Sequence, residues 1–225
     1  MAWLFAHGDF DVEPDVIAPQ LQRRLAGEPL QYIRGRCDFY GREFFVDERV
    51  LIPRPETELV VEQAVARAPR GARVVDVGTG SGCIAVSLAL ERPDLHVIGV
   101  DVSVAALAVA KRNRDRLGAR VEFAASDLLD AVNKVDLVVS NPPYIPAADV
   151  ETLQTEVKDH EPRGALTPGP RGTEIIERLL HSGVPAIIEI GYGQADALRE
   201  RVDEVIPDLA GIPRVVVSSA RHGRK

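Results

Sequence analysis

The segment RVVDVGTGSG, Arg73–Gly82, places a run of valines directly before a loop that contains three glycines. β-Branched residues in a short run favour a strand, and glycines allow the tight turns that end one. Apolar residues then return at helical spacing, at Ile84, Ala85, Leu88 and Ala89. The segment therefore predicts a strand, a glycine-rich turn and a helix, which together form the first unit of an α/β sheet.

The same alternation of strand and helix patterns continues along the chain. We predict further strands at His96–Val100, Val121–Ala124, Val135–Ser140 and Ala186–Ile190. Ser103 stands where a helix N-cap is expected, and a helix over Glu174–Ser182 has Thr173 as its N-cap and Gly183 at its end. Strands that alternate with helices in this way predict a parallel sheet with crossover helices.

The C-terminal part of the chain predicts a change of strand direction. Glu204–Ile206 and Arg214–Ser218 are both strand-like, and the link between them carries proline and glycine but is too short for a crossover helix. A hairpin follows, with an antiparallel strand at the end of the sheet. The predicted fold class is thus α/β, with a Rossmann-like, seven-stranded, mostly parallel sheet and an antiparallel C-terminal strand.

Residues 1–72 have a different pattern. Helical character at Val16–Ala26 precedes the aromatic and β-branched stretch Phe39–Val50, in which Gly41 marks the turn of a hairpin. Pro53-Arg54-Pro55 then breaks the chain before a predicted helix at Glu56–Ala68. We divide the chain into an N-terminal helical segment (1–35), a hairpin linker (36–55) and the sheet domain (56–225).

Composition and charge exclude several classes of protein. Lys and Arg number 27 against 34 Asp and Glu, and the net charge of −7 argues against a long basic face that holds nucleic acid. No apolar run approaches the ~18 residues of a membrane helix, and no export signal opens the chain. Cys37 and Cys83 lie far apart with no metal-binding spacing. We expect a cytoplasmic protein with no metal, no membrane contact and no stable nucleic-acid partner.

The glycine loop predicts a site for a nucleotide-like ligand. It comprises Asp76, Gly78, Thr79, Gly80, Ser81 and Gly82, at the point where a strand meets a helix N-terminus. A dinucleotide fingerprint counted from Gly78 requires glycine where Cys83 stands, which weakens a nicotinamide-cofactor interpretation. Asp101 closes the second strand, where a carboxylate can accept hydrogen bonds from ribose hydroxyls. An adenosine-containing ligand is the natural hypothesis.

The tetrapeptide Asn141-Pro142-Pro143-Tyr144 follows the predicted strand Val135–Ser140. Ligands of open α/β sheets bind beyond the carboxyl ends of the strands, so this tetrapeptide faces the same crevice as the glycine loop. The amide oxygen of Asn141 and the carbonyl of Pro142 can accept hydrogen bonds from a substrate –NH2, and the Tyr144 ring offers a surface for stacking. The motif therefore indicates a planar amino or amide nitrogen as the group acted upon.

Together, the glycine loop, Asp101 and Asn141–Tyr144 resemble a class I S-adenosylmethionine-dependent methyltransferase that acts on nitrogen. Other stretches resemble the HemK-type release factor glutamine methyltransferases: LIPRPETE (Leu51–Glu58), EPRGAL (Glu161–Leu166), GEPLQYI (Gly27–Ile33) and EIG (Glu189–Gly191). The likeness runs from about residue 26 to residue 217.

The resemblance implies N5 methylation of the glutamine in the Gly-Gly-Gln motif of class I peptide-chain release factors, with S-adenosyl-L-methionine as methyl donor, by a monomer. It implies catalytic roles for Asn141, Pro142 and Tyr144. The implied cofactor-binding set is Asp76, Gly78, Thr79, Gly80, Ser81, Gly82, Asp101, Asp127, Leu128 and Asn141. The implied substrate-binding set is Asn141, Pro142, Pro143, Tyr144, Arg54 and Glu56.

Three departures from the family pattern accompany the likeness. Ala2–His7 resembles a segment from the middle of the family's helical bundle, so residues 1–35 are expected to be the remnant of a substrate-docking domain. Arg171-Gly172-Thr173 stands where the family has an acidic residue and then Gly-Leu. Asp127-Leu128 stands where some relatives carry an aromatic residue beside adenine, which predicts weaker stacking there.

Other functions remain open from the sequence. A DNA or RNA amino-group methyltransferase, such as an adenine N6 enzyme, would share the pocket but should add a base-reading region and a basic surface. A glutamine methyltransferase for a ribosomal protein would share both the pocket and the chemistry. A non-catalytic module that binds the cofactor would lack turnover altogether.

Overall fold

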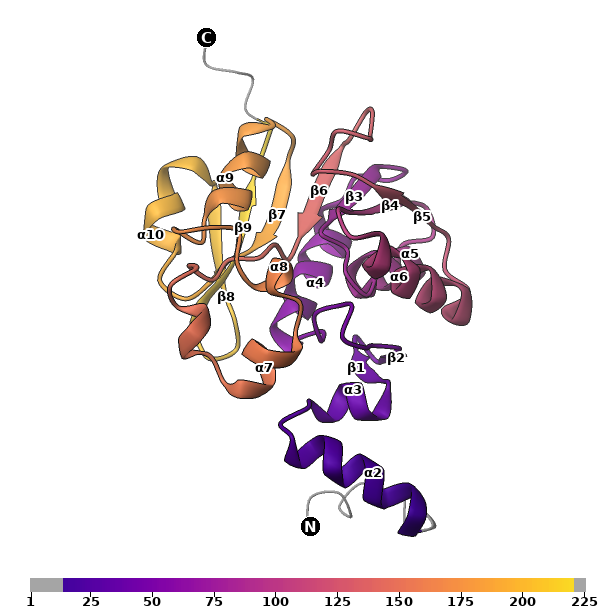
Figure 1. Ribbon diagram of the computed structural model, residues 1–225. Helices are drawn as coiled ribbons and strands as arrows, with labels where there is room; N and C mark the ends of the chain where they lie inside the picture. The colour runs from indigo at the N-terminus through magenta and orange to yellow at the C-terminus, as the bar shows by residue number, and fades with distance from the viewer. Residues whose placement is uncertain (1–13, 221–225) are drawn as a thin grey trace.

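The computed structural model describes residues 14–220 and contains a mixed sheet of seven strands (Figure 1). The strands are β3 (Arg73–Val77), β4 (His96–Asp101), β5 (Val121–Ala125), β6 (Leu137–Ser140), β7 (Ala186–Glu189), β8 (Glu204–Pro207) and β9 (Pro213–Ser218). Their order across the sheet is β5-β4-β3-β6-β7-β9-β8. The predicted fold class is confirmed. The segment Ala2–His7, compared above with a helical bundle, lies outside the described residues.

Within the described part of the sheet, β9 is the one strand that runs opposite to the other six. Strands β3 to β7 are mutually parallel, whereas β9 is antiparallel to both β7 and β8. The antiparallel C-terminal strand was predicted at the end of the sheet, but β9 lies between β7 and β8, and β8 is the edge strand. A hairpin fixes only that β8 and β9 are neighbours, and the chain can place either of them next to β7.

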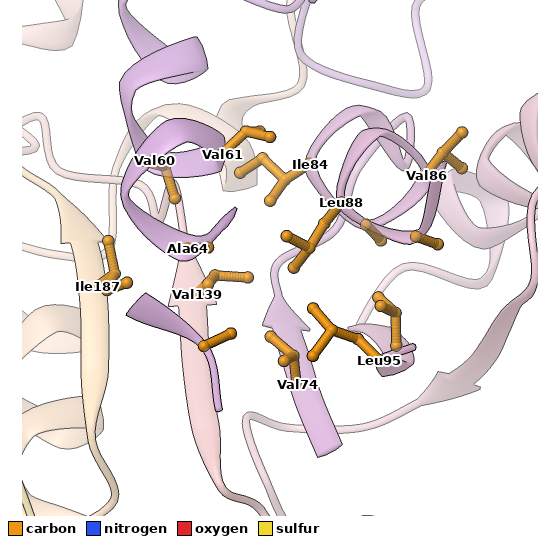
Figure 2. Close-up of a cluster of buried hydrophobic side chains, with 14 of the residues drawn as sticks. Val60, Val61, Ala64, Val74, Ile84, Val86, Leu88, Leu95, Val139 and Ile187 are labelled. Atoms are coloured by element: carbon orange, nitrogen blue, oxygen red, sulfur yellow. The ribbon is translucent and has the colours of Figure 1, made fainter. Parts of the chain in front are cut away.

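Helices cover both faces of the sheet. On one face, α4 (Glu58–Arg67) and α5 (Cys83–Glu91) pack on the strands, and α6 (Val104–Leu117) lies beside α5. The other face carries α9 (Glu174–His181) and α10 (Ala195–Leu198), next to β7 and β9 in Figure 1. Figure 2 shows the first core, in which side chains of α4 and α5 contact alternate residues of β3, β6 and β7. Its labelled members include Val60, Val61, Ile84, Leu88, Val74, Val139 and Ile187.

The alternation of side chains along each strand divides the two cores. Val139 of β6 and Ile187 of β7 point to the α4 face, whereas their neighbours Val138 and Ile188 point to the α9 face. Strands buried on both faces carry near-continuous apolar runs, which explains why the strand positions could be predicted from the sequence. The same alternation decides which way the residues just beyond each strand point.

The N-terminal part confirms the predicted hairpin in a shorter form. Strands β1 (Cys37–Phe39) and β2 (Arg42–Phe44) are joined by Tyr40 and Gly41, both of which have positive φ angles. Two such residues give the primed turn that matches the twist of a hairpin. The helix α2 (Pro14–Leu25) lies close to its predicted position, and a second short helix, α3 (Leu30–Arg34), follows it.

The remaining helices begin later or are shorter than the sequence predicts. A single 3₁₀ turn, η1 (Pro55–Thr57), precedes α4, because Pro55 sets a helical φ but has no N–H to donate. No helix was predicted for the segment directly after Tyr144. It forms η2 (Val150–Thr152), α7 (Thr155–His160) and α8 (Arg163–Leu166). Another 3₁₀ turn, η3 (Arg199–Arg201), follows α10. Across residues 14–220, no helix is both long enough and apolar enough to cross a bilayer.

Candidate active site

A cavity of about 360 Å³ opens at the carboxyl ends of β3, β4 and β6. The chain passes from β3 outward to β5 and returns to β6 on the other side of β3, so the strand order reverses at this point. Open α/β sheets bind ligands at such a reversal. Several of the predicted site residues line the cavity: Gly78, Gly80, Asp101, Asp127, Leu128, Asn141, Pro142 and Pro143.

Backbone geometry explains the glycines of the loop after β3. Gly78 and Gly80 both have left-handed φ angles and line the cavity, and a Cβ atom on Gly78 would meet no atom within 4 Å. Gly82 also has a positive φ, but a Cβ atom there would lie 3.1 Å from the Cβ atom of Ala110 in α6. The first two glycines therefore expose backbone to the cavity, whereas Gly82 allows α5 to approach α6.

Asp76 stabilises the glycine loop by hydrogen bonds from the protein interior. Its fully buried carboxylate accepts hydrogen bonds at Oδ2 from Thr79 Oγ1 (2.6 Å) and from the backbone N–H of Ala85 (3.2 Å). The Ser81 carbonyl accepts a bond from Asn113 Nδ2 (2.9 Å). Burial raises the pKa of Asp76 to about 7. Asp76, Thr79, Ser81 and Gly82 thus lie behind the lining of the cavity and support its wall.

Asp101 joins the glycine loop to the start of α6. Its Oδ2 accepts a hydrogen bond from the backbone N–H of Gly80 (2.9 Å), and its Oδ1 accepts one from that of Ser103 (2.8 Å). A carboxylate oxygen can accept more than one hydrogen bond, so each oxygen keeps capacity for a ligand hydroxyl. Ser103 caps α6 by accepting from the N–H of Ala106, as predicted. Thr173 occupies the predicted N-cap position of α9, but its hydroxyl donates to Glu177 instead of capping.

Asn141 is the first member of a chain of hydrogen bonds that includes the buried residues Thr57 and Glu189. Its Nδ2 donates to Thr57 Oγ1 (2.9 Å), and Thr57 Oγ1 donates to Glu189 Oε2 (2.7 Å). Tyr144 donates from its hydroxyl to the other oxygen, Glu189 Oε1 (3.2 Å). Burial raises the pKa of Glu189 to about 7 and also raises the pKa of Tyr144. The structure thus turns the Tyr144 hydroxyl toward Glu189, and the residues that line the cavity do not include Tyr144.

Arg54 pairs with a residue far along the chain. Its Nη2 lies 2.5 Å from Glu161 Oε1, whereas Glu56 is exposed on the surface. The pair connects the segment Leu51–Glu58 to the segment Glu161–Leu166, and members of both segments line the cavity. Burial raises the pKa of the Glu161 carboxyl, although Arg54 opposes that shift. Arg54 and Glu56 therefore lie outside the cavity lining, and Arg54 holds two of its walls together.

Two buried residues of this site, Thr57 and Glu189, were not predicted from the sequence. Both occur in segments that carry the family resemblance, but neither was assigned a role. A carboxylate that follows the buried run Ala186–Ile188 at the ligand-binding edge of a sheet is the one feature that could have drawn attention to Glu189. Among residues 14–220 there is no cluster of three or more His, Cys, Asp or Glu side chains arranged to hold a metal ion.

Comparisons with known protein sequences agree with this geometry. Residues 55–169 match the family model described as "Methyltransferase small domain". A release factor glutamine methyltransferase of Koribacter versatilis is 46% identical over 236 residues, which cover 96% of this chain and 84% of the relative. Proteins of the same name from Geobacter sulfurreducens (44% identical) and Neisseria gonorrhoeae (45% identical) each cover 87% of this chain, with 73% and 78% of their own lengths aligned.

Solved structures show the same fold at low identity. The hMettl16 catalytic domain in complex with MAT2A 3'UTR hairpin 6 has a TM-score of 0.63 at 15% identity and covers 96% of both chains. A Pyrococcus abyssi tRNA (uracil-54, C5)-methyltransferase in complex with S-adenosyl-L-homocysteine has a TM-score of 0.53 at 16% identity, covering 81% of this chain and 43% of its own. At these identities the likeness concerns the fold alone.

Proposed function

This chain belongs to the release factor glutamine methyltransferase family, and from that membership we propose its reaction. It transfers a methyl group from S-adenosyl-L-methionine to the side-chain amide nitrogen of the glutamine in the Gly-Gly-Gln motif of class I peptide-chain release factors. S-adenosyl-L-homocysteine leaves as the product, and the amide nitrogen releases one proton to solvent. The proposed partner is thus a loop of another protein. We propose that this chain acts on it in the cytoplasm, as a monomer.

The observation that carries the proposal is the position of Asn141. Its Nδ2 is occupied by Thr57, so its Oδ1 is left to accept a hydrogen bond at the wall of the cavity that also contains Asp101 and the glycine loop. A side-chain amide of a substrate presents two N–H donors in one plane. The Asn141 oxygen and the Pro142 carbonyl are the acceptors that we assign to them.

The cavity fits the proposed methyl donor. Its volume of about 360 Å³ falls in the range of small-molecule sites. Gly78 leaves free space where a side chain would project, and the oxygens of Asp101 can accept hydrogen bonds from a ribose. Leu128 adds an apolar wall for a purine. When bound, S-adenosylmethionine supplies a methyl carbon that is already electrophilic, so the protein has to align the acceptor rather than activate the donor.

The residues of this chain act on the acceptor nitrogen. An amide nitrogen is a weak nucleophile because its lone pair is delocalised into the carbonyl group. Acceptors at Asn141 and Pro142 stabilise the positive charge that develops on the –NH2 group as the lone pair becomes localised. The ion pair of Arg54 and Glu161 holds two walls of the cavity together, which helps to keep these acceptors aligned. None of these steps calls for a metal ion.

Methyl transfer to candidate substrates tests this function. The protein is incubated with isotope-labelled S-adenosylmethionine and, in separate reactions, with a class I release factor, ribosomal proteins, DNA and RNA. We expect mass spectrometry to find one added methyl group on the Gly-Gly-Gln glutamine, and none on a control release factor in which that glutamine is replaced. Methyl transfer to DNA, RNA or a ribosomal protein without transfer to that glutamine would overturn the proposal.

A further inference from the structure

The register of the sheet brings Asn141 and Glu189 to one side. Strands β6 and β7 run parallel with Ser140 opposite Ile188. The next residues are Asn141, directly after β6, and Glu189, the last residue of β7. Two residues earlier, Val139 and Ile187 point into the core beneath α4. Side chains alternate along strands, so Asn141 and Glu189 point the same way, toward the beginning of α4. Thr57, which directly precedes α4, meets both of them there.

Burial raises the pKa of Glu189 to about 7, so its carboxyl group is ionised above that pH. In that state the protons of this cluster can be arranged in only one way. A carboxylate can only accept hydrogen bonds, so Thr57 must donate its single hydroxyl proton to Glu189 Oε2. The same hydroxyl can then only accept from Asn141, and the side chain of Asn141 must offer Nδ2 to it. Tyr144 donates to Oε1 and occupies the other carboxylate oxygen.

The direction of these bonds determines which atom of Asn141 meets a substrate. Nδ2 faces Thr57, and no residue in the range 14–220 donates a hydrogen bond to Oδ1. If the amide were flipped, its two N–H groups would confront the two N–H groups of the substrate amide, and neither side could accept. Because Thr57 and Glu189 are each only 1% exposed, water cannot easily replace the missing partners in such a flipped state.

We propose that Thr57 and Glu189 are positioning residues, which fix the Asn141 amide with its oxygen toward the acceptor nitrogen. The inference rests on the proposed function, because it assumes an acceptor –NH2 group beside Asn141. Neither residue touches the substrate. Both act by setting the orientation of a catalytic group before the substrate arrives, so that no reorganisation is needed during methyl transfer.

A set of threonine variants tests the role of the hydroxyl. Thr57→Val keeps the shape but removes the hydroxyl, and we expect kcat to fall about 10- to 100-fold while KM for the release factor and Kd for S-adenosylmethionine stay within about 3-fold. Thr57→Ser restores the hydroxyl and should recover most of kcat. Thr173→Val is the matched control, since the Thr173 hydroxyl also donates to a glutamate, Glu177, outside the cavity lining. Equal kcat values for Thr57→Val and Thr173→Val would overturn the proposal.

A second set of variants reverses the direction of the hydrogen bonds. In Asn141→Asp, two carboxylates compete for the one Thr57 proton, and we expect kcat to fall about 100-fold or more. In Asn141→Asp/Glu189→Gln, the new amide can donate to Thr57, whose proton then serves the new carboxylate. Every bond of the cluster is thereby restored, and an oxygen again faces the substrate. We expect kcat of the double variant to be about 10-fold or more above kcat of Asn141→Asp. A double variant no more active than Asn141→Asp would overturn the proposal.

A readout without substrate separates this inference from the proposed function. In the ¹⁵N-labelled protein, the side-chain NH2 resonance of Asn141 is assigned by its loss in Asn141→Asp. We expect the Nδ2 proton that is donated to Thr57 to exchange slowly with water in the wild type and in Thr173→Val, and quickly in Thr57→Val. Slow exchange together with a failure to methylate any release factor would sink the proposed function but keep the hydrogen-bond arrangement. An unchanged resonance in Thr57→Val would sink the arrangement itself.

Discussion

Arg54 Nη2 lies 2.5 Å from Glu161 Oε1, although the two residues are 107 positions apart in the chain. The Glu161 side chain is only 1% exposed, whereas that of Arg54 is 32% exposed. The carboxylate therefore depends on the guanidinium far more than the guanidinium depends on it. The pair joins the segment Leu51–Glu58, which leads into α4, to the segment Glu161–Leu166, and both segments contribute residues to the cavity lining.

Removal of Arg54 should destabilise the protein. Arg54→Ala leaves the buried Glu161 charge without its partner, and we expect a loss of about 2–4 kcal/mol in the free energy of unfolding. Since the pKa of Glu161 should rise further without Arg54, the loss should be largest at alkaline pH and should shrink toward pH 5. Urea denaturation across pH measures this. In Arg54→Ala/Glu161→Gln no buried charge is left, and a double variant as unstable as Arg54→Ala would contradict the explanation.

Asp101 should control the affinity for the methyl donor. Charge-assisted hydrogen bonds to ribose hydroxyls contribute about 1.5–3 kcal/mol each, and Asp101 also holds the N–H groups of Gly80 and Ser103 in place. We expect Asp101→Ala to weaken S-adenosylmethionine binding tenfold or more, as measured by calorimetry. Asp196→Ala, on the exposed start of α10, is the control. An unchanged affinity in Asp101→Ala would remove this residue from the site.

Asn141→Ala should separate chemistry from binding. The amide of Asn141 is assigned to the acceptor nitrogen, so its loss should fall on the transition state and reduce turnover on the order of 100-fold or more. Binding of S-adenosylmethionine should stay within a few-fold of the wild type. Single-turnover methyl transfer and calorimetry give the two quantities. Near-normal turnover would refute the assigned mechanism.

Two glycine variants should have opposite consequences. Gly78→Ala and Gly82→Ala both place a side chain at a positive φ angle, which costs roughly 1–2 kcal/mol. The methyl group of Gly78→Ala projects toward the cavity without touching protein, so we expect weaker binding of S-adenosylmethionine. In Gly82→Ala the methyl group crowds Ala110 of α6, so the main loss should be in thermal stability. The reverse pattern would show that Gly78 does not face the ligand.

Asp76 should make stability depend on pH in a defined direction. Burial raises the pKa of this carboxyl to about 7 in the folded protein, against ~3.9 for an unperturbed aspartate. The folded state thus binds the proton more tightly, and its stability falls as pH rises from about 4 to 7. We expect the wild type to lose stability relative to Asp76→Asn across that window, on the order of a few kcal/mol. If the stability of the wild type minus that of Asp76→Asn stays constant or rises with pH, Asp76 is ionised throughout this window.

Local patterns were sufficient to predict the sheet and the place of its ligand site. Buried parallel strands have a continuous apolar pattern, and their carboxyl ends must lie at one edge, so the sequence alone predicts that the glycine loop, Asp101 and Asn141 lie together. The roles of Thr57 and Glu189 could not, because they depend on the register between β6 and β7 and on where α4 begins. The partner of Arg54 was missed for the same reason. The stacking role of Tyr144 stays a prediction, and the hydrogen bond from its hydroxyl to Glu189 was not predicted.

The position of β9 has a consequence for the order of folding. The chain makes β8 before β9, yet within the described part of the sheet the one strand beside β8 is β9. A nascent chain that has just completed β8 therefore exposes β7 as an open edge, with Ile187 and Ile188 at its centre. Open apolar edges can pair with other chains. Until β9 inserts, this protein passes through a stage that is prone to aggregation, and mutations that delay insertion of Pro213–Ser218 should lower its yield without altering its active site.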